Sequence, residues 1–248
     1  MPRPLALLPP RPRHDAEKMS SEQEEKLRLV RGSVQTFLDF PKPGITFLTP
    51  ICVIGPHVDP RHLTGSPSRL RILWTRSDIP GIWEETYHSG MAVTLAKDIL
   101  PILKDPRAFN AVIDLLEDHL KRKFLQMDLI VGLDARGFFF GPSLAQRLGI
   151  GFVPIRKKGK LPGKIFSISY NLEYGEAELE IQIDSVKSQQ KVVILDDLIA
   201  TGGTLRAAYD LMKKIGADVL ECLVVIEIKD LNGTEKLNCV PFHSLVQF

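Results

Sequence analysis

The stretch that decides the fold is residues 192–204, which read VVILDDLIATGGT. Its first residues form a short apolar run, which predicts a buried β-strand. Two adjacent acids, Asp196 and Asp197, stand at the carboxyl end of this strand, and a loop of small residues leads from them into a predicted helix. In an open α/β sheet, ligands bind at the carboxyl ends of the strands. The stretch therefore predicts a strand–loop–helix unit with a binding site at its turn.

The loop of this unit has the composition of an anion site. Five small residues can expose successive backbone N–H groups and two hydroxyls at the helix N-terminus: Ala200, Thr201, Gly202, Gly203 and Thr204. The carboxylates ahead of them suit ribose hydroxyls, which donate hydrogen bonds to carboxylates. Together they indicate a pocket for a sugar phosphate. The alternative is a plain strand–turn–helix junction with solvated acids. Neither Walker A spacing nor GxGxxG is present, which disfavours ATPases and dinucleotide enzymes.

Strand-like and helix-like segments alternate around this unit. The expected strands are residues 128–133, 151–155, 191–195 and 218–228. The expected helices begin at Ser21, Pro106, Pro142 and Thr204, the first at a capping box over residues 21–24. Residues 164–183 alternate in polarity and predict a β-hairpin or flap. This order predicts an α/β fold in which helices flank a parallel sheet.

The composition excludes several functional classes. The chain has 248 residues, of which 44% are hydrophobic and 25% charged, and its net charge of +2 indicates no broad affinity for nucleic acid or membrane. Three cysteines without CxxC spacing favour a reducing compartment over a disulfide framework or a zinc site. No apolar run reaches the roughly 18 residues of a membrane-spanning helix. We expect a cytoplasmic protein that binds neither nucleic acid nor membrane.

Two segments do not fit a compact domain. Residues 1–19 are rich in proline and arginine and predict a disordered tail, with a targeting segment as the alternative. Residues 48–97 show no sustained periodicity, and a structureless loop of this length is improbable inside a domain. We interpret them as an insertion. The prediction is one domain over residues 20–248 that this insertion interrupts.

Two further segments carry charged residues at the ends of predicted strands. Residues 132–138 (GLDARGF) contain Asp134, Ala135 and Arg136, and the planar guanidinium of Arg136 is a donor fork. Residues 156–164 (RKKGKLPGK) contain five cations, among which Arg156, Lys157 and Lys160 are candidates for anion binding. A surface ion pair and a solvated basic loop are the respective alternatives.

Taken together, these motifs resemble those of the type I phosphoribosyltransferases. The stretch 192–204 resembles the family's phosphoribosyl pyrophosphate signature. Residues 40–44 (FPKPG), 160–163 (KLPG) and 172–175 (LEYG) resemble the adenine-specific branch. The resemblance covers about four-fifths of the chain. It implies the type I phosphoribosyltransferase fold, a parallel sheet flanked by helices with a β-hairpin flap.

The resemblance implies roles for these residues. Asp196 and Asp197 would contact the ribose, and residues 200–204 would wrap the 5′-phosphate. The turn at Asp134, Ala135 and Arg136 would bind pyrophosphate, with Arg136 acting in catalysis and the basic loop nearby. Glu173 in the flap would be the acid/base partner of adenine N7, and Tyr174 would pack or orient.

The adenine site implied by the resemblance comprises Thr46, Phe47 and, on the opposite side, Ile228. Plain core packing is the alternative for all three. The insertion falls inside this segment, so that the next base-contacting position is either Leu48 or Lys97.

The implied reaction joins adenine and phosphoribosyl pyrophosphate to give AMP and pyrophosphate, through an oxocarbenium-like transition state. Mg²⁺ would bind mainly through substrate oxygens, without a metal site built by the protein. The family's usual state implies a homodimer. Two alternatives stay open: a catalytically impaired variant that still dimerises, and a regulator that binds phosphoribosyl pyrophosphate without turnover.

Overall fold

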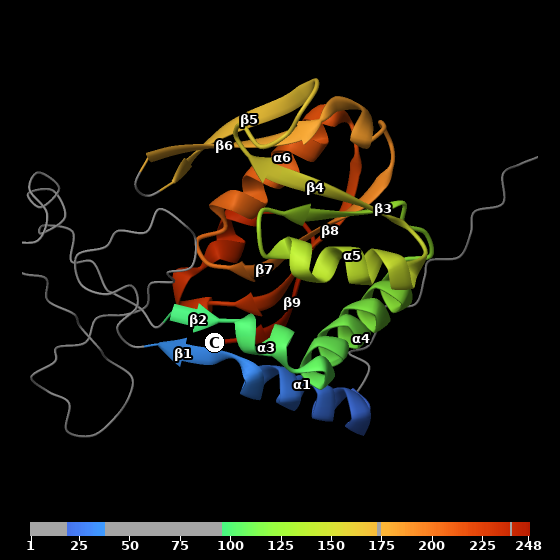
Figure 1. The fold of residues 1–248 in the computed structure, drawn as a ribbon, viewed down its shortest axis with the longest axis vertical. Coiled ribbons are helices and arrows are strands. Elements are labelled where there is room, and N and C mark those ends of the chain that lie inside the picture. The colour runs from blue at the N-terminus through green and yellow to red at the C-terminus, as the bar shows by residue number, and fades with distance from the viewer. Residues whose placement is uncertain (1–18, 38–95, 173–174, 239) are drawn as a thin grey trace, which may run out of the picture.

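The computed structural model describes residues 19–37, 96–172, 175–238 and 240–248 (Figure 1). These residues form a seven-stranded sheet in the order β5-β6-β4-β3-β7-β8-β9. The strands are β3 (Leu129–Leu133), β4 (Gly151–Lys157), β5 (Ile165–Leu172), β6 (Gly175–Gln182), β7 (Lys191–Ile199), β8 (Asp218–Glu227) and β9 (Phe242–Gln247). Five of them, from β4 to β9 in the sheet order, are parallel, and the hairpin β5–β6 joins β4 in antiparallel fashion. The predicted parallel sheet with a hairpin is therefore confirmed.

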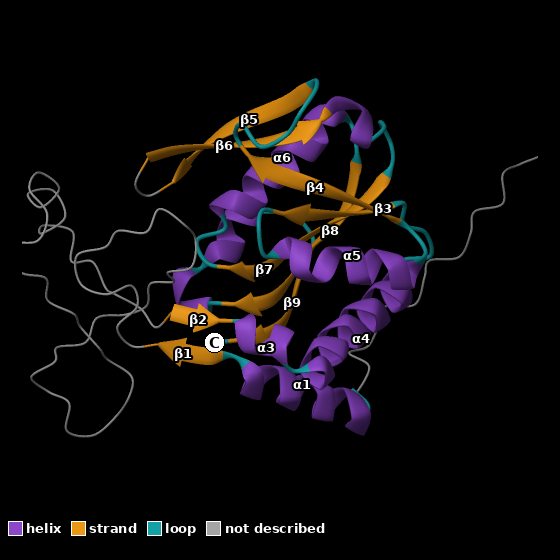
Figure 2. Cartoon of the chain, viewed as in Figure 1, coloured by secondary structure: helices purple, strands orange, loops and turns teal. Residues whose placement is uncertain are grey.

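Helices cover both faces of this sheet (Figure 2). They are α1 (Ser21–Ser33), α3 (Leu100–Lys104), α4 (Pro106–Lys123), α5 (Gly137–Leu148) and α6 (Gly203–Ile215). Short 3₁₀ segments follow as η2 (Ile183–Ser185), η3 (Lys229–Leu231) and η4 (Gly233–Leu237). A small antiparallel pair, β1 (Gln35–Phe37) and β2 (Ala96–Asp98), stands apart from the main sheet.

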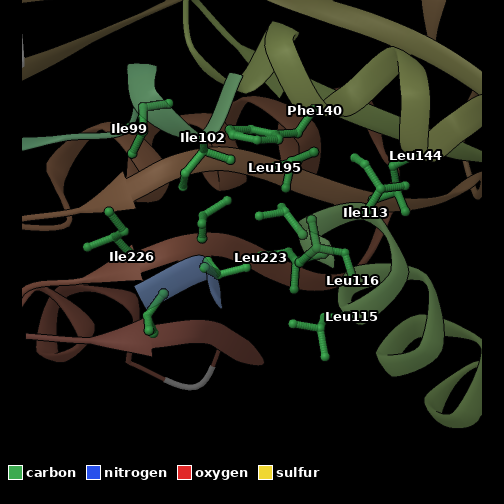
Figure 3. Close-up of a cluster of buried hydrophobic side chains, with 14 of the residues drawn as sticks. Ile99, Ile102, Ile113, Leu115, Leu116, Phe140, Leu144, Leu195, Leu223 and Ile226 are labelled. Carbon is green, nitrogen blue, oxygen red and sulfur yellow. The ribbon is translucent and has the colours of Figure 1, made fainter. Parts of the chain in front are cut away.

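The central strands are apolar on both sides because each side meets helices. In β7, Val193 and Leu195 join a core with α1, α3, α4 and α5 (Figure 3), whereas Ile194 joins a second core with α6. In β3, Ile130 and Val131 divide in the same way. Burial on both faces explains the unbroken apolar runs that predicted a parallel sheet.

Most predicted elements are present, and several boundaries differ, of which three change the interpretation. The capping box lies one residue earlier than predicted, because Ser20 rather than Ser21 caps α1 and Gln23 completes the box. α5 begins at Gly137, so that Pro142 lies inside it rather than at its start. β7 continues to Ile199 because its pairing with β8 extends past the acids, which lie within the strand and not after it.

The two segments that did not fit a domain lie almost wholly outside the described residues. Met19 precedes α1, and residues 96 and 97 belong to β2, which pairs with β1 in the register Phe37↔Ala96. The disordered tail and the insertion stay predictions. Within the described part of the chain, no helix has the length and apolar character needed to cross a membrane.

A cluster of titratable side chains around the buried Glu221 links α4 to β8 and β9. The rings of His119 and His243 stack with centroids 3.7 Å apart, and His119 Nε2 lies 2.8 Å from the fully buried carboxylate of Glu221. Burial and the neighbouring His119 lower the pKa of His243 from its usual 6.5 to about 4. Burial alone would raise the pKa of Glu221, but His119 and Lys123 outweigh it and lower this pKa.

We predict that His243 makes the fold sensitive to mild acid. The unfolded chain takes up a proton near pH 6.5 that the folded chain refuses until about pH 4, so that stability falls across this interval. In the variant H243F, which keeps a ring against His119, this loss should shrink by on the order of 2 kcal/mol. Denaturant unfolding of both proteins at pH 7 and pH 5 measures it. The raised pKa values of Asp196 and Asp197 change the stability in the opposite direction, by the same amount in both proteins. The prediction therefore concerns the difference between the pH dependences of wild type and H243F. Parallel pH profiles would contradict the prediction.

Candidate active site

Two helices begin with free N-termini at one edge of the sheet. α5 follows the end of β3, and α6 follows the end of β7, the parallel neighbour of β3. Among the described residues no side chain caps either helix, and neither helix has an acid in its first turn. By contrast, Ser20 and Asp105 cap α1 and α4. Free N–H groups at the positive end of a helix dipole make both starts suited to anions.

Between these helix starts an arginine meets an acid. Arg136 Nε lies 2.8 Å from Asp197 Oδ2, and both side chains are largely buried. The approach is possible because of Gly137, where a Cβ would lie only 2.5 Å from the Leu195 carbonyl oxygen. Within the described chain Asp197 Oδ2 receives no well-aligned hydrogen bond, although the ion pair is short. This oxygen is itself buried, so the ion pair with Arg136 compensates its charge.

The adjacent acids do not ionise independently. Burial raises the pKa of Asp196 well above its usual value, and the charge of Asp197 raises it further. Burial also raises the pKa of Asp197, but Arg136 partly offsets this effect. Asp197 therefore holds the negative charge more readily. Asp196, which is partly exposed, is the acid more readily protonated.

At the end of β3, Asp134 gathers the basic residues of the neighbouring strand. Its Oδ2 accepts hydrogen bonds from Arg156 Nε at 3.2 Å and from the Lys157 N–H at 3.4 Å, and Lys160 Nζ lies 3.4 Å away. Burial alone would raise the pKa of Asp134, but these groups outweigh it and lower the pKa. The Asp134–Ala135 peptide bond is cis. The structure thus brings three of the predicted residues together around the carboxylate of a fourth, Asp134.

The basic loop after β4 rests on the acidic strand β6. The Gly159 N–H donates to Glu180 Oε2 at 2.9 Å, and Lys158 forms an ion pair with Glu178. Glu180 is almost fully buried. These contacts fix the root of the loop to the hairpin, in contrast to the alternative of a wholly solvated loop.

Tyr170 in β5 is a site residue that the sequence reasoning missed. Its side chain lies beside the Thr204 side chain at the start of α6, close enough for Thr204 to affect its pKa. Burial raises the pKa of Tyr170, Thr204 partly lowers it, and the charge of Asp196 raises it again. Phe166, Ile168 and Tyr170 alternate along the strand and pack against the α6 core. That alternation was the available signal for an inward-facing tyrosine.

At the carboxyl end of β8, the separate strand β2 comes close to the main sheet. The Lys97 ammonium lies 4.1 Å from the ring centroid of Phe248. Phe248 is hydrogen-bonded through its backbone to Glu227 and Lys229, which flank the buried Ile228. Lys97 and Ile228, both predicted near the base, therefore belong to one neighbourhood.

Five of the residues considered in the sequence lie outside the described part of the chain: Thr46, Phe47, Leu48, Glu173 and Tyr174. Their roles stay predictions.

The geometry combines two uncapped helix starts with an acid pair, of which Asp197 is buried and Asp196 partly exposed, and with a group of cations. Such a site can hold a diol between two separate phosphate groups. The sequence profile of the phosphoribosyl transferase domain matches residues 100–238, a range that contains β3, β7 and both helix starts. The chain therefore belongs to the phosphoribosyltransferases.

Its relatives narrow this class. The adenine phosphoribosyltransferase of Homo sapiens is 42% identical over 226 residues, 91% of this chain and 98% of the relative. That of Rattus norvegicus is 57% identical over 155 residues, 62% of this chain and 86% of the relative. Within its family the chain belongs with the adenine phosphoribosyltransferases, as the sequence motifs predicted.

Solved structures agree with this placement. The Saccharomyces cerevisiae adenine phosphoribosyltransferase, in complex with adenine and an imino-altritol bisphosphate, superposes with a TM-score of 0.67 and 33% identity over 90% of this chain and 99% of that chain. The Trypanosoma brucei enzyme, in complex with AMP, pyrophosphate and ribose-5-phosphate, gives 0.59 and 31% over 63% of this chain and 71% of that chain. The expected type I fold is confirmed.

We predict that removing Arg136 destabilises the protein in a pH-dependent manner. In R136M the acid pair loses its cation, so that the raised pKa values of Asp196 and Asp197 rise further. At a pH above these pKa values, a negative charge then stays buried without a positive partner. The loss should be about 3 kcal/mol at pH 8 and should shrink as the pH falls, because the folded state then protonates the pair. Chemical denaturation measures it.

The matched control is R107M, whose arginine is 84% exposed in its pair with Asp105. It should cost little at either pH. A loss for R136M that is equal at pH 8 and pH 5 would contradict the prediction.

Proposed function

We propose that this chain transfers the 5-phosphoribosyl group of phosphoribosyl pyrophosphate to adenine, forming AMP and pyrophosphate. The observation that carries the proposal is the Arg136–Asp197 pair set between two free helix starts at one sheet edge. The ligands of the Saccharomyces cerevisiae and Trypanosoma brucei relatives, which include adenine, AMP and pyrophosphate, support it.

In this proposal the loop of residues 200–204 takes the 5′-phosphate at the start of α6. Asp196 and Asp197 accept hydrogen bonds from the ribose hydroxyls, and Asp196 is the partly exposed acid of the two. The turn with Ala135 and Arg136 takes the pyrophosphate at the start of α5. As the bond between C1′ and pyrophosphate breaks and adenine N9 bonds to C1′, positive charge develops beside the acids and negative charge beside the cations.

The cations that Asp134 gathers suit the leaving pyrophosphate. Arg156 and Lys160 both lie within 3.4 Å of one carboxylate oxygen, which fixes their positions before substrate arrives. Preorganised charges cost no rearrangement during the reaction.

The residues present fit a magnesium ion that is held mainly by the substrate. In the described part of the chain there is no group of three or more His, Cys, Asp or Glu that could cage a metal. Mg²⁺ keeps several waters and binds substrate phosphates readily, and Asp196 and Asp197 are the protein carboxylates at this site. When bound, the ion supplies neutralisation of the pyrophosphate charge.

Glu173 is proposed to exchange the proton at adenine N7, with Tyr174 beside it. Thr46, Phe47 and Ile228 are proposed to enclose the base, with Leu48 or Lys97 at the next position. The LEYG and FPKPG motifs support these roles. We also infer a cytoplasmic homodimer, for which the cysteine pattern and the resemblance to the family are the support; light scattering of the purified protein tests the dimer.

The test is product formation by the purified full chain with Mg²⁺ and phosphoribosyl pyrophosphate. Adenine, hypoxanthine, guanine and orotate are offered in parallel, with an EDTA control. AMP formed from adenine alone supports the proposal. A folded protein that forms no nucleotide from any base rules it out, and a catalytically impaired variant then becomes the better description.

We predict that E173Q lowers kcat for AMP formation by about a hundredfold, because general acid–base catalysis contributes about 10²–10⁴-fold. The KM for phosphoribosyl pyrophosphate should change little, since the acid pair and the helix starts are intact. Steady-state kinetics measures both. E176Q, in the same hairpin, is the control and should stay within about twofold of wild type. An unchanged kcat in E173Q would remove Glu173 from the mechanism.

A further inference from the structure

The loop of residues 200–204 is supported from behind by a segment close to the C-terminal strand. This segment is η4 and the residue before it, Asn232, which follows β8 and precedes β9. No part of it belongs to the motif VVILDDLIATGGT. It nevertheless touches the loop backbone to backbone.

The contact is so close that neither partner has room for a side chain. A Cβ on Gly233 would lie 2.9 Å from the Gly202 nitrogen and nearer still to the Ala200 carbonyl oxygen. A Cβ on Gly202 would lie 2.9 Å from the Gly233 carbonyl carbon and nearer still to its oxygen. All of these neighbours are main-chain atoms, which cannot swing aside as the end of a flexible side chain can.

The segment is firmly held on its other side. Leu237 and Val240 are 1% and 8% exposed and belong to the core with α6. Asn232 adopts the left-handed conformation, with φ 49°, and its carbonyl accepts the Glu235 N–H at 3.0 Å. The turn therefore holds Gly233 against the loop from a segment that is packed into the core.

We propose that Gly233 is a positioning residue for phosphate binding, and that η4 fixes the loop of residues 200–204 in the shape that binds the 5′-phosphate. The inference rests on the proposed function of that loop. With η4 packed against the loop, the N–H groups at the start of α6 keep their directions without a bound anion. Without it, part of the binding free energy is spent on ordering the loop.

The test is G233A, which adds one methyl group where the backbone has no room. The loop must then shift by about 1 Å, and a misplacement of that size can reduce rates about a hundredfold. The affinity for ribose 5-phosphate, measured by calorimetry on the full chain, should fall about 10- to 100-fold. The KM for phosphoribosyl pyrophosphate should rise with it, while the KM for adenine should change little.

The matched control is G32A in α1, where a Cβ meets nothing within 4 Å. Circular dichroism and thermal unfolding establish that both variants are folded. A merely structural role for Gly233 would lower the amount of active protein and leave both KM values unchanged. That result, or a ribose 5-phosphate affinity within twofold of wild type, overturns the proposal.

Two further measurements separate other failures. If G233A does not fold, N232A decides, because alanine strains the left-handed turn without filling the contact: a several-fold weaker affinity supports the proposal and an unchanged affinity overturns it. If the wild-type chain itself binds no ribose 5-phosphate, the proposed function fails. Hydrogen exchange of residues 200–204 then tests whether η4 orders the loop. Faster exchange in G233A than in wild type supports this ordering, and equal exchange overturns it.

Discussion

The structure depends on the parallel pairing of β3 with β7. Because the strands run in the same direction, with Leu129 opposite Val192 and Gly132 opposite Leu195, both end at one edge of the sheet. Each strand leads directly into a helix, so that α5 and α6 direct their positive ends to that edge. Antiparallel pairing would place the two helix starts at opposite ends of the sheet. The site is thus a consequence of strand direction before any side chain is considered.

The same arrangement offsets the electrostatic cost of placing two adjacent acids, one of them buried, at this end of the strand. Asp196 and Asp197 both have raised pKa values, and burial is the largest cause of each. Arg136 reaches Asp197 from the turn between β3 and α5, because Gly137 allows α5 to begin against the Leu195 carbonyl. One acid is therefore compensated and the other is left able to exchange a proton or receive a hydrogen bond. This asymmetry suits a ligand that brings both hydroxyl donors and anionic groups.

The local parts of this site were predictable from the sequence, and the contacts between them were not. The apolar run before Asp196, the small residues after it and the stop at Gly216 are read along the chain, and α6 has those limits. The strand extended beyond the predicted 195 because β8 continues to pair with it as far as Ile199. Tyr170 was missed because its partner Thr204 lies in another element, and the alternation of one strand does not reveal what it will face.

The loop of residues 200–204 illustrates why such distant contacts matter. It contains Gly202 with φ +76°, where a left-handed backbone favours glycine, so its sequence alone specifies flexibility as much as shape. Rigidity has to come from outside the loop. Tyr170 lies beside Thr204 on the hairpin side, and Gly233 lies against the backbone on the other. A glycine-rich loop clamped between two separate elements can therefore be both close enough to a phosphate for its N–H groups to bind it and ordered before the phosphate arrives.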